Sequence, residues 1–341
     1  MKKNLVFGLI GLIPWNCTTD FKLTADYKEV MVVWCLLSQN DTTHYVRIQK
    51  AYLDENTSAL VIAQNPDSIY YPDILNVTIE QDDPTNVWTL ERIDGDTLPE
   101  PIKKETGVFS STKNILYRFT AALDENATYK LTVENTVSGL TATGTTNLVK
   151  DFRITRPITG LDVNFVGPSG LLQVNWDVAV NGRLHDLTIR VRYWIADAQM
   201  HTVKLKDTFV DIPIFRGRSF TETGQYDITK EAFYNGVAAK LDPIPGFVRH
   251  SDSLDFIFAV GSMALADYVN YNQAQTGITS SQVIINYTNI EGGLGLFASR
   301  YSKTVVKVPL FSNSLDTLAC GAITGHLNFV PTQSLFYPFC E

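Results

Sequence analysis

The chain has 341 residues and a formal net charge of −8, with 45% hydrophobic and 19% charged residues. These values are typical of a globular protein with sizeable cores, and the length suggests two domains. They argue against a disordered chain, and they make nucleic acid a poor partner, because binding to phosphates depends on clustered Lys and Arg that this acidic sequence does not show.

The N-terminus has the order of an export signal. Two lysines precede an apolar run over residues 5–13, and Cys17 follows shortly after. This order is typical of a lipoprotein signal peptide, here residues 1–16, and the run is shorter than the roughly 20 residues of a membrane-spanning helix. We therefore expect lipidation of Cys17, although residues 14–16 differ from the usual small residues before a lipidated cysteine. The alternative is a core strand near the N-terminus.

Short β patterns separated by polar turns follow in residues 17–150, the predicted N-terminal domain. Residues 29–37 are apolar on both faces, which predicts a central strand, and residues 44–53 follow a polar turn and complete a hairpin. Further strands are expected over 75–80, 87–93, 116–121 and 129–134, with an edge strand over 137–148. This spacing is typical of an immunoglobulin-like sandwich.

Residues 151–157 form the predicted boundary, and residues 151–310 form the predicted C-terminal domain. Leu172, Val174 and Trp176 alternate as in a strand, and the alternating segment 187–193 places arginines on its opposite face. A Trp on an early strand before a long alternating strand resembles a fibronectin type III or immunoglobulin-like sandwich. The expected fold class is mainly β, with two such sandwich domains.

Two short helical insertions are expected within the second domain. Residues 226–241 and 262–276 both place apolar side chains at helical spacing. Strands are expected over 255–260, 283–287 and 304–308, and residues 311–341 are expected to form a tail packed on the second domain.

The sequence shows no catalytic motif. The five histidines are scattered without zinc-ligand spacing, no Gly-x-Ser-x-Gly motif occurs, and the glycines near residue 293 lack the Lys-Ser/Thr of a phosphate loop. Acidic pairs at 54–55, 82–83 and 124–125 fit solvated turns better than a glycosidase dyad. We expect no catalytic residues, no metal and no cofactor, and predict that the protein is not an enzyme.

Cysteines and loop aromatics supply the remaining candidates. Cys320 and Cys340 form a possible disulfide in an oxidising compartment, whereas Cys35 is expected to be a buried apolar residue. Rings in predicted loops are either ligand or partner contacts or caps on the core. The candidate contacts are Tyr70, Tyr71, Phe336 and Tyr337.

Two segments carry a resemblance to a known family. Residues 26–53, soon after the signal cysteine, and the segment Thr288-Asn-Ile-Glu-Gly-Gly-Leu-Gly-Leu-Phe297 resemble the opening and closing segments of Bacteroidota outer-membrane lipoproteins of unknown function. The closing segment also resembles a related family often encoded beside TonB-dependent transporters. The resemblance implies two β-sandwich-like domains and a lipid anchor at Cys17, on the periplasmic or cell-surface face of the outer membrane.

Three functions remain open at this point. The first is a non-enzymatic accessory or binding subunit of an outer-membrane complex for transport, secretion or assembly, held to the membrane by its N-terminal lipid. The second is a surface glycan-binding or adhesive lipoprotein. The third is a hydrolase with two carboxylates brought together from distant positions, about 5 to 9.5 Å apart.

Overall fold

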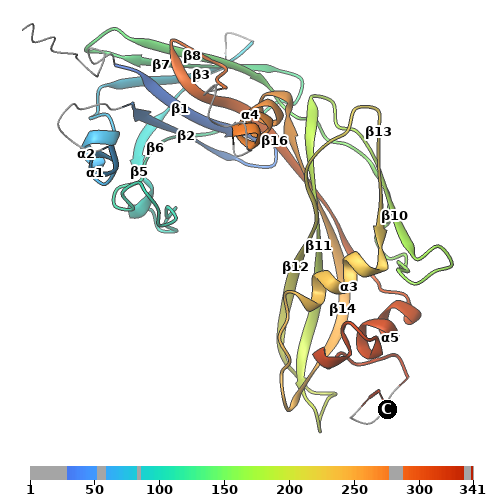
Figure 1. The fold of residues 1–341 in the computed structure, drawn as a ribbon. Helices are drawn as coiled ribbons and strands as arrows, with labels where there is room; N and C mark the ends of the chain where they lie inside the picture. Colours follow the sequence, from blue (N-terminus) through green and yellow to red (C-terminus); the bar gives the residue numbers. More distant parts are fainter. Residues whose placement is uncertain (1–28, 52–58, 83–85, 276–286, 334–338, 341) are drawn as a thin grey trace, which may run out of the picture.

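The structure is a computed structural model, which describes residues 29–51, 59–82, 86–275, 287–333 and 339–340. This part of the chain is mainly β, as predicted. Its strands form two lobes joined at an angle, which gives the molecule the outline of an arch (Figure 1).

The first lobe contains short and medium strands and a few short helices. Its strands are β1 (Met31–Leu37), β2 (Thr43–Lys50), β3 (Leu75–Gln81), β4 (Val87–Thr89), β5 (Glu91–Asp94), β6 (Ile115–Thr120), β7 (Thr128–Asn135) and β8 (Thr141–Asn147). Its helices are α1 (Ala59–Ala63), α2 (Pro66–Ile69) and the 3-10 helix η1 (Gly95–Thr97).

The second lobe is built on long strands. Its strands are β9 (Ile154–Arg156), β10 (Leu171–Asp177), β11 (Gly182–Asp197), β12 (Lys204–Ser219), β13 (Thr223–Thr229) and β14 (Phe247–Ser262). Its helices are α3 (Lys230–Ala238), α5 (Ser312–Cys320) and the 3-10 helix η2 (Gly325–Leu327). Where the lobes meet, the chain forms α4 (Met263–Gln275) and β16 (Gly293–Val308). Between these two elements in the sequence, the short strand β15 (Ile290–Glu291) pairs with β8 of the first lobe.

One eight-stranded sheet runs through both lobes, in the order β12-β11-β14-β16-β1-β2-β6-β5. Strand β16 is shared, because residues 293–299 pair in parallel with β1 and residues 300–308 pair antiparallel with β14. Residues 290–299, assigned by sequence to the second domain, thus pair with strands of the first lobe. A continuous sheet of this kind differs from two separate immunoglobulin-like sandwiches, each with its own pair of sheets.

The glycine-rich segment with the family resemblance is the start of this shared strand. Gly295 has a φ of +118°, and a Cβ at this position would lie 1.9 Å from the carbonyl oxygen of Val33 on β1. Only glycine allows so close an approach of two backbones. The Asn289 side chain accepts a hydrogen bond from the Phe297 N–H and donates one to the Phe297 carbonyl, which closes the loop before β16. The segment therefore has a structural role.

The first lobe packs the shared sheet against a five-stranded sheet, β15-β8-β7-β3-β4. Alternate residues of β1 enter the core between the two sheets, and Cys35 is buried among them, as predicted. Burial raises the pKa of the Cys35 thiol, because the core disfavours a thiolate. The other residues of β1 point away from this core.

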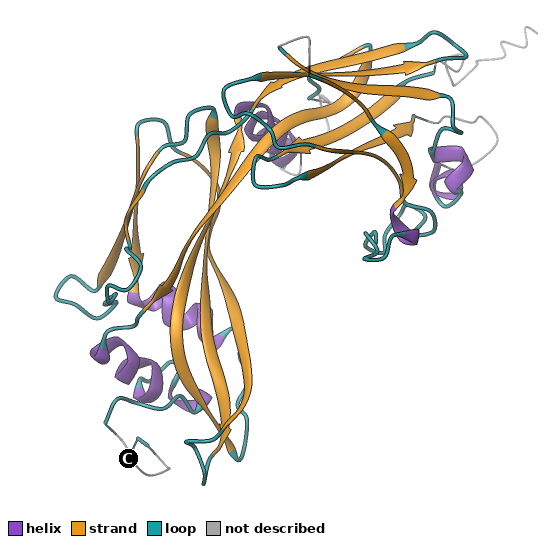
Figure 2. Ribbon diagram, turned by 180° about the vertical axis from the view of Figure 1, so that it is seen from behind, coloured by secondary structure: helices purple, strands orange, loops and turns teal. Residues whose placement is uncertain are grey.

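The second lobe packs the long strands against a three-stranded sheet, β13-β10-β9, and against helices α3 and α5. Figure 2 shows these two helices on one side of the long strands. Trp176 on β10 lies opposite Gly224 on β13, where a Cβ would come within 2.1 Å of the indole ring. The large ring therefore fills the space that glycine leaves, and it joins a cluster of aromatic side chains.

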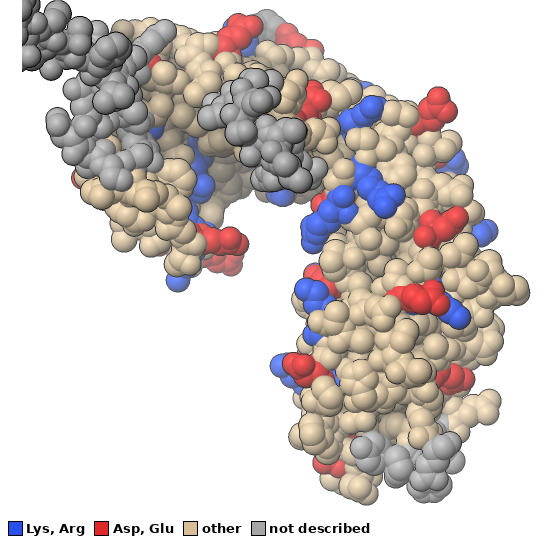
Figure 3. Space-filling view, viewed as in Figure 1, with Lys and Arg blue, Asp and Glu red and all other residues tan. Residues whose placement is uncertain are grey.

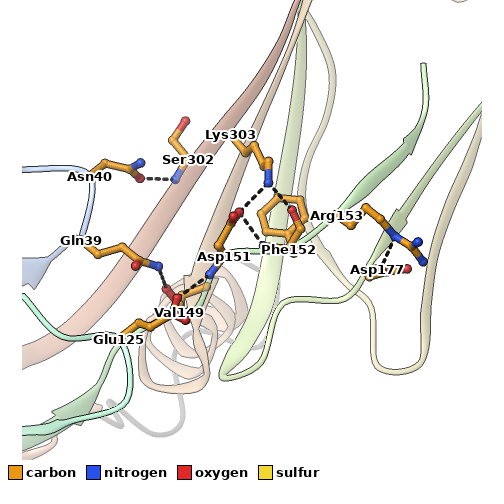
Figure 4. Close-up of polar contacts among 10 residues, drawn as sticks. All are labelled: Gln39, Asn40, Glu125, Val149, Asp151, Phe152, Arg153, Asp177, Ser302 and Lys303. Carbon is orange, nitrogen blue, oxygen red and sulfur yellow. Dashed lines mark hydrogen bonds and ion pairs between the residues drawn. The ribbon is translucent and has the colours of Figure 1, made fainter. Parts of the chain in front are cut away.

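Polar contacts tie the linker between the lobes to the sheet they share (Figure 4). The Lys303 ammonium on β16 lies 2.7 Å from an Asp151 carboxylate oxygen and also donates to the carbonyl of Phe152. The Gln39 amide donates to the Val149 carbonyl at 3.0 Å. The lobes are thus joined by sheet hydrogen bonds and by side chains.

Several predicted elements differ in extent from the observed ones. The helix expected over 226–241 begins only at Lys230, because residues 223–229 pair with β10 as β13, and Thr229 caps the helix. The strand expected over 87–93 is divided into β4 and β5, which belong to different sheets. The helix expected over 262–276 is confirmed as α4. The strand expected over 283–287 lies outside the described residues except for Tyr287.

Candidate functional site

The most prominent hollow of the described molecule is a groove on the outer face of the first-lobe sheet. It lies over the faces of β16, β1 and β2 that point away from the core. Three adjoining cavities of about 480, 740 and 210 Å³ make up this groove, and each is lined by Trp34 and Tyr268. Together, the volumes of these adjoining cavities exceed the space that a single small molecule usually fills, which suits an extended ligand. We call it the first-lobe groove.

The floor of the first-lobe groove is apolar because β1 is apolar on both faces. Val33 and its alternate neighbours point into the core, so Val32, Trp34 and Leu36 point into the groove. Leu36 is 40% exposed, which is unusual for a central strand. Apolar surface left open within a hollow commonly marks an interaction site.

Helix α4 supplies the second ring of the floor. The Tyr268 ring lies 5.3 Å from the Trp34 ring at an interplanar angle of 74°, an edge-to-face contact. Gly261 at the end of β14 allows α4 to fold down onto the sheet, because a Cβ there would come within 2.6 Å of Leu265. The ring pair therefore joins a strand and a helix from opposite halves of the sequence, β1 and α4.

Arg47 stands beside the floor at the wall shared by the two larger cavities. Sheet register places Arg47 of β2 directly opposite Trp34 of β1, and both side chains point outward. One guanidinium nitrogen donates to the Asn114 side-chain oxygen at 3.0 Å, while the Nε atom is buried with no hydrogen-bond partner. Leaving such a donor unsatisfied costs about 1–3 kcal/mol.

The partner of Arg47 is itself held rigidly. Asn114 is fully buried, its N–H donates to an Asp94 carboxylate oxygen, and its amide nitrogen donates to the carbonyl of Ile102. These bonds orient the Asn114 oxygen toward β2. The guanidinium is consequently pre-organised, and little side-chain entropy remains to be lost on binding.

Tyr70 and Tyr71 are not exposed rings, which corrects the expectation that they form an open platform. Each is only 4% exposed. Tyr70 lies beneath a lysine of the groove wall, because its hydroxyl accepts a hydrogen bond from Lys104 at 3.2 Å and its ring lies 5.3 Å from the ammonium. The Lys50 ammonium lies 5.9 Å from the Tyr71 ring. These tyrosines support basic residues of the groove.

Burial and neighbouring charge shift the pKa values of two residues at this wall, Lys104 and Tyr70. Burial lowers the pKa of Lys104, and the positive charge of Arg47 lowers it further. Burial raises the pKa of the Tyr70 hydroxyl, so this group stays a neutral partner. An anion bound nearby would therefore stabilise the protonated, charged form of the Lys104 side chain.

The remaining predicted site residues lie away from the groove. The structure joins Cys320 and Cys340 in a disulfide, with a Cα–Cα distance of 5.4 Å, at the far end of the second lobe. Cys17, Phe336 and Tyr337 lie outside the described residues.

Two of the acids considered as catalytic candidates form structural hydrogen bonds instead. Asp124 accepts a hydrogen bond from the Asn126 N–H in a turn, and Glu125 accepts one from the Asp151 N–H in the linker. Within the described ranges, no three His, Cys, Asp or Glu side chains are grouped as metal ligands. None of the described helices is both long and apolar enough to cross a membrane.

Trp34, Arg47 and Tyr268 are not among the site residues predicted from the sequence. The available signal was the strand 29–37, apolar on both faces, since a central strand with an outward Trp requires either a cover or a ligand. The opposite position of Arg47 and the approach of α4 depend on register and tertiary packing. No protein-family model matches the chain, and no curated protein matches it in sequence.

Proposed function

We propose that this chain is a non-enzymatic cell-envelope lipoprotein, which acts as a binding or accessory subunit of an outer-membrane complex for transport, secretion or assembly. The signal-like residues 1–16 and Cys17 support the location. The first-lobe groove supports a binding role, and it carries the proposal, because it combines an aromatic pair with a half-buried arginine. Trp, Tyr and Arg are the residue types that contribute most to protein interfaces.

The architecture around the groove favours tight docking. Its floor is made by β1 and β16, and β16 continues as a strand of the second lobe. A partner docked on this floor contacts a strand of the shared sheet, whose side chains are already in place. Such a platform lowers the entropic cost of association.

Affinity purification from native membranes tests the proposed complex. We expect an outer-membrane protein to co-purify with the wild-type chain and to be lost with Trp34→Ala. Phe209→Ala is the matched control, because Phe209 is an exposed aromatic residue on β12, outside the groove. A wild-type chain that stays monomeric and co-purifies with no outer-membrane protein would contradict the proposed complex.

The lipid anchor is tested separately. We expect Cys17→Ala to release the protein from the membrane fraction, and mass spectrometry of the wild-type N-terminus to show acyl chains on Cys17. Membrane retention of the variant together with an unacylated wild-type chain would refute the anchor.

The second candidate function is glycan binding at the cell surface. The Trp34–Tyr268 pair favours it, because aromatic rings in a groove can stack on sugar rings as well as on side chains. A glycan array distinguishes the two. Glycan binding that Trp34→Ala abolishes, with no co-purifying protein, would favour this alternative.

A further inference from the structure

Among the described residues, the wall of the first-lobe groove carries more basic than acidic side chains. The largest cavity is lined by Arg47, Lys50, Lys103 and Lys104, and Glu105 is its one acidic lining residue. The surrounding chain is acidic, with a net charge of −8. A local excess of positive charge on an acidic protein raises the local concentration of anions and guides them to this surface. Figure 3 shows Lys and Arg side chains on the wall of the hollow beneath the first lobe.

These basic side chains are oriented by neutral groups. Arg47 donates to an amide oxygen, Lys104 to a tyrosine hydroxyl and Lys50 to the backbone carbonyl of Asp67. Among the described residues, no carboxylate forms an ion pair with any of these three cations. Each retains unused capacity to bind an anion.

Some basic residues outside this wall do have carboxylate partners. Arg118, on the same sheet, lies 2.6 Å from a Glu91 carboxylate oxygen, and Lys303 lies 2.7 Å from Asp151. Arg190 binds the Asp211 carboxylate through two nitrogens. Other described cations, such as Arg92 and Arg249, also donate to backbone carbonyls, so the distinguishing property of the groove wall is that four basic side chains gather there around one hollow. This clustering points to an external anion.

The floor indicates what the anion is attached to. Beside the rings of Trp34 and Tyr268, the floor exposes aliphatic side chains, including Val32 and Leu294. Branched aliphatic surface suits the apolar side chains of a polypeptide, whereas a sugar needs more hydrogen-bonding groups. The loop at the outer end adds Val108 and Phe109, both about half exposed. The apolar strip thus runs alongside the cations over the length of the groove.

We infer that the first-lobe groove binds an acidic polypeptide segment, with an apolar side chain on the Trp34–Tyr268 floor and carboxylates at Arg47 and Lys104. This inference deepens the proposed function, on which it rests for the identity of a natural partner. The Arg47 guanidinium has a planar, forked set of donors that matches a carboxylate.

A peptide selection with the purified full chain tests this inference. The immobilised protein is exposed to a random twelve-residue peptide library, and the selected peptides are then measured by fluorescence anisotropy. We expect selected sequences rich in Asp or Glu next to Leu, Phe or Trp. Their affinity should fall at least about tenfold in Arg47→Gln and in Trp34→Ala. It should change less than about twofold in Arg118→Gln, which removes an equal charge outside the groove.

One further variant and a check of the fold keep the test decisive. Lys104→Gln removes a second cation, should Arg47→Gln disturb the buried Asn114 network, and thermal unfolding of each variant checks the fold. Selected peptides without acidic residues, or acidic peptides that bind Arg47→Gln and Lys104→Gln as tightly as wild type, would overturn the inference. So would equal competition by inorganic phosphate or by phosphatidylglycerol vesicles, since the groove would then recognise anions or lipid surfaces in general.

The failure of this inference is distinguishable from the failure of the proposed function. The selection uses purified protein, so it depends neither on the lipid anchor nor on a membrane partner. Acidic peptides that require Arg47, with no outer-membrane protein in the native purification, would retain the ligand class and reject the complex. A co-purifying partner that binds independently of Arg47 and Lys104 would retain the complex and reject the ligand class.

Discussion

Replacement of Gly295 by alanine tests the idea that the shared strand holds the first lobe together. Gly295 has a φ of +118°, where an L-residue is strained, and its added Cβ would lie 1.9 Å from the Val33 carbonyl oxygen. Because the obstructing atom belongs to the backbone of β1, no side-chain rotation relieves the contact. Strands β1 and β16 must separate locally, and the pair Trp34–Leu296 lies next to this point.

We expect Gly295→Ala to lose much of its folding stability. The backbone conformation alone costs about 1–3 kcal/mol for a residue with a Cβ, and displacement of a central strand adds lost packing and hydrogen bonds. We therefore expect Gly295→Ala to lower the free energy of unfolding by at least about 3 kcal/mol. The displacement of β1 should also weaken ligand binding in the groove, since Trp34 moves with it.

Urea unfolding followed by circular dichroism and tryptophan fluorescence measures this effect. Gly107→Ala is the control, because a Cβ at Gly107 meets nothing within 4 Å and the residue has no positive φ. The free energy of unfolding of Gly107→Ala should stay within about 0.5 kcal/mol of the wild-type value. A Gly295→Ala protein with the unfolding midpoint of the wild type would refute the close-approach argument.

Four other substitutions test the second lobe. Cys340→Ser removes the disulfide across a sequence separation of 20 residues and should cost about 3 kcal/mol, visible as faster proteolysis of the tail. Arg192→Ala leaves the carboxylate of Asp255, 2% exposed, without its 2.6 Å partner. It should cost about 3 kcal/mol of unfolding free energy in urea, against less than about 1 kcal/mol for Arg190→Ala at a more exposed pair. Equal costs would contradict the role of burial. Burial lowers the pKa of His185 in the folded protein, so the unfolded chain binds a proton at this histidine more readily than the folded protein does. The free energy of unfolding is therefore highest above the usual His pKa of about 6.5 and falls as the pH drops below it. His185→Phe should make the urea midpoint less dependent on pH between about 7.5 and 5, and an unchanged dependence would argue against this origin.

Much of the β structure was predictable because local alternation follows burial. The strand over 29–37 was expected to be central, and β1 indeed lies between β16 and β2. Residues 187–193 were expected to alternate, and β11 buries Leu187, Ile189 and Val191 while its arginines face the other side. The turns and helix α4 carried similar local signals. Period-two patterns report on a strand whatever its partners are.

Other strands carried no such signal. Strand β12 is an edge strand with exposed residues through most of its length, so its sequence lacks the alternation of a half-buried strand. Strand β16 begins with glycines, which weaken a strand pattern, and its partner β1 lies far away in the sequence. The division of 87–93 between two sheets has the same origin, since each half pairs with a different distant strand.

The sequence by itself determined the mainly β character, the outward apolar face of β1 and the signal-like N-terminus, because these depend on residues that are neighbours along the chain. Only the tertiary structure decided that the lobes share one strand, that Tyr70 and Tyr71 are buried supports, and that Trp34, Arg47 and Tyr268 meet in one groove. The reason is physical. Register across strands and the docking of a helix on a sheet are set by contacts between residues that lie far apart in the sequence, and no local pattern encodes such contacts.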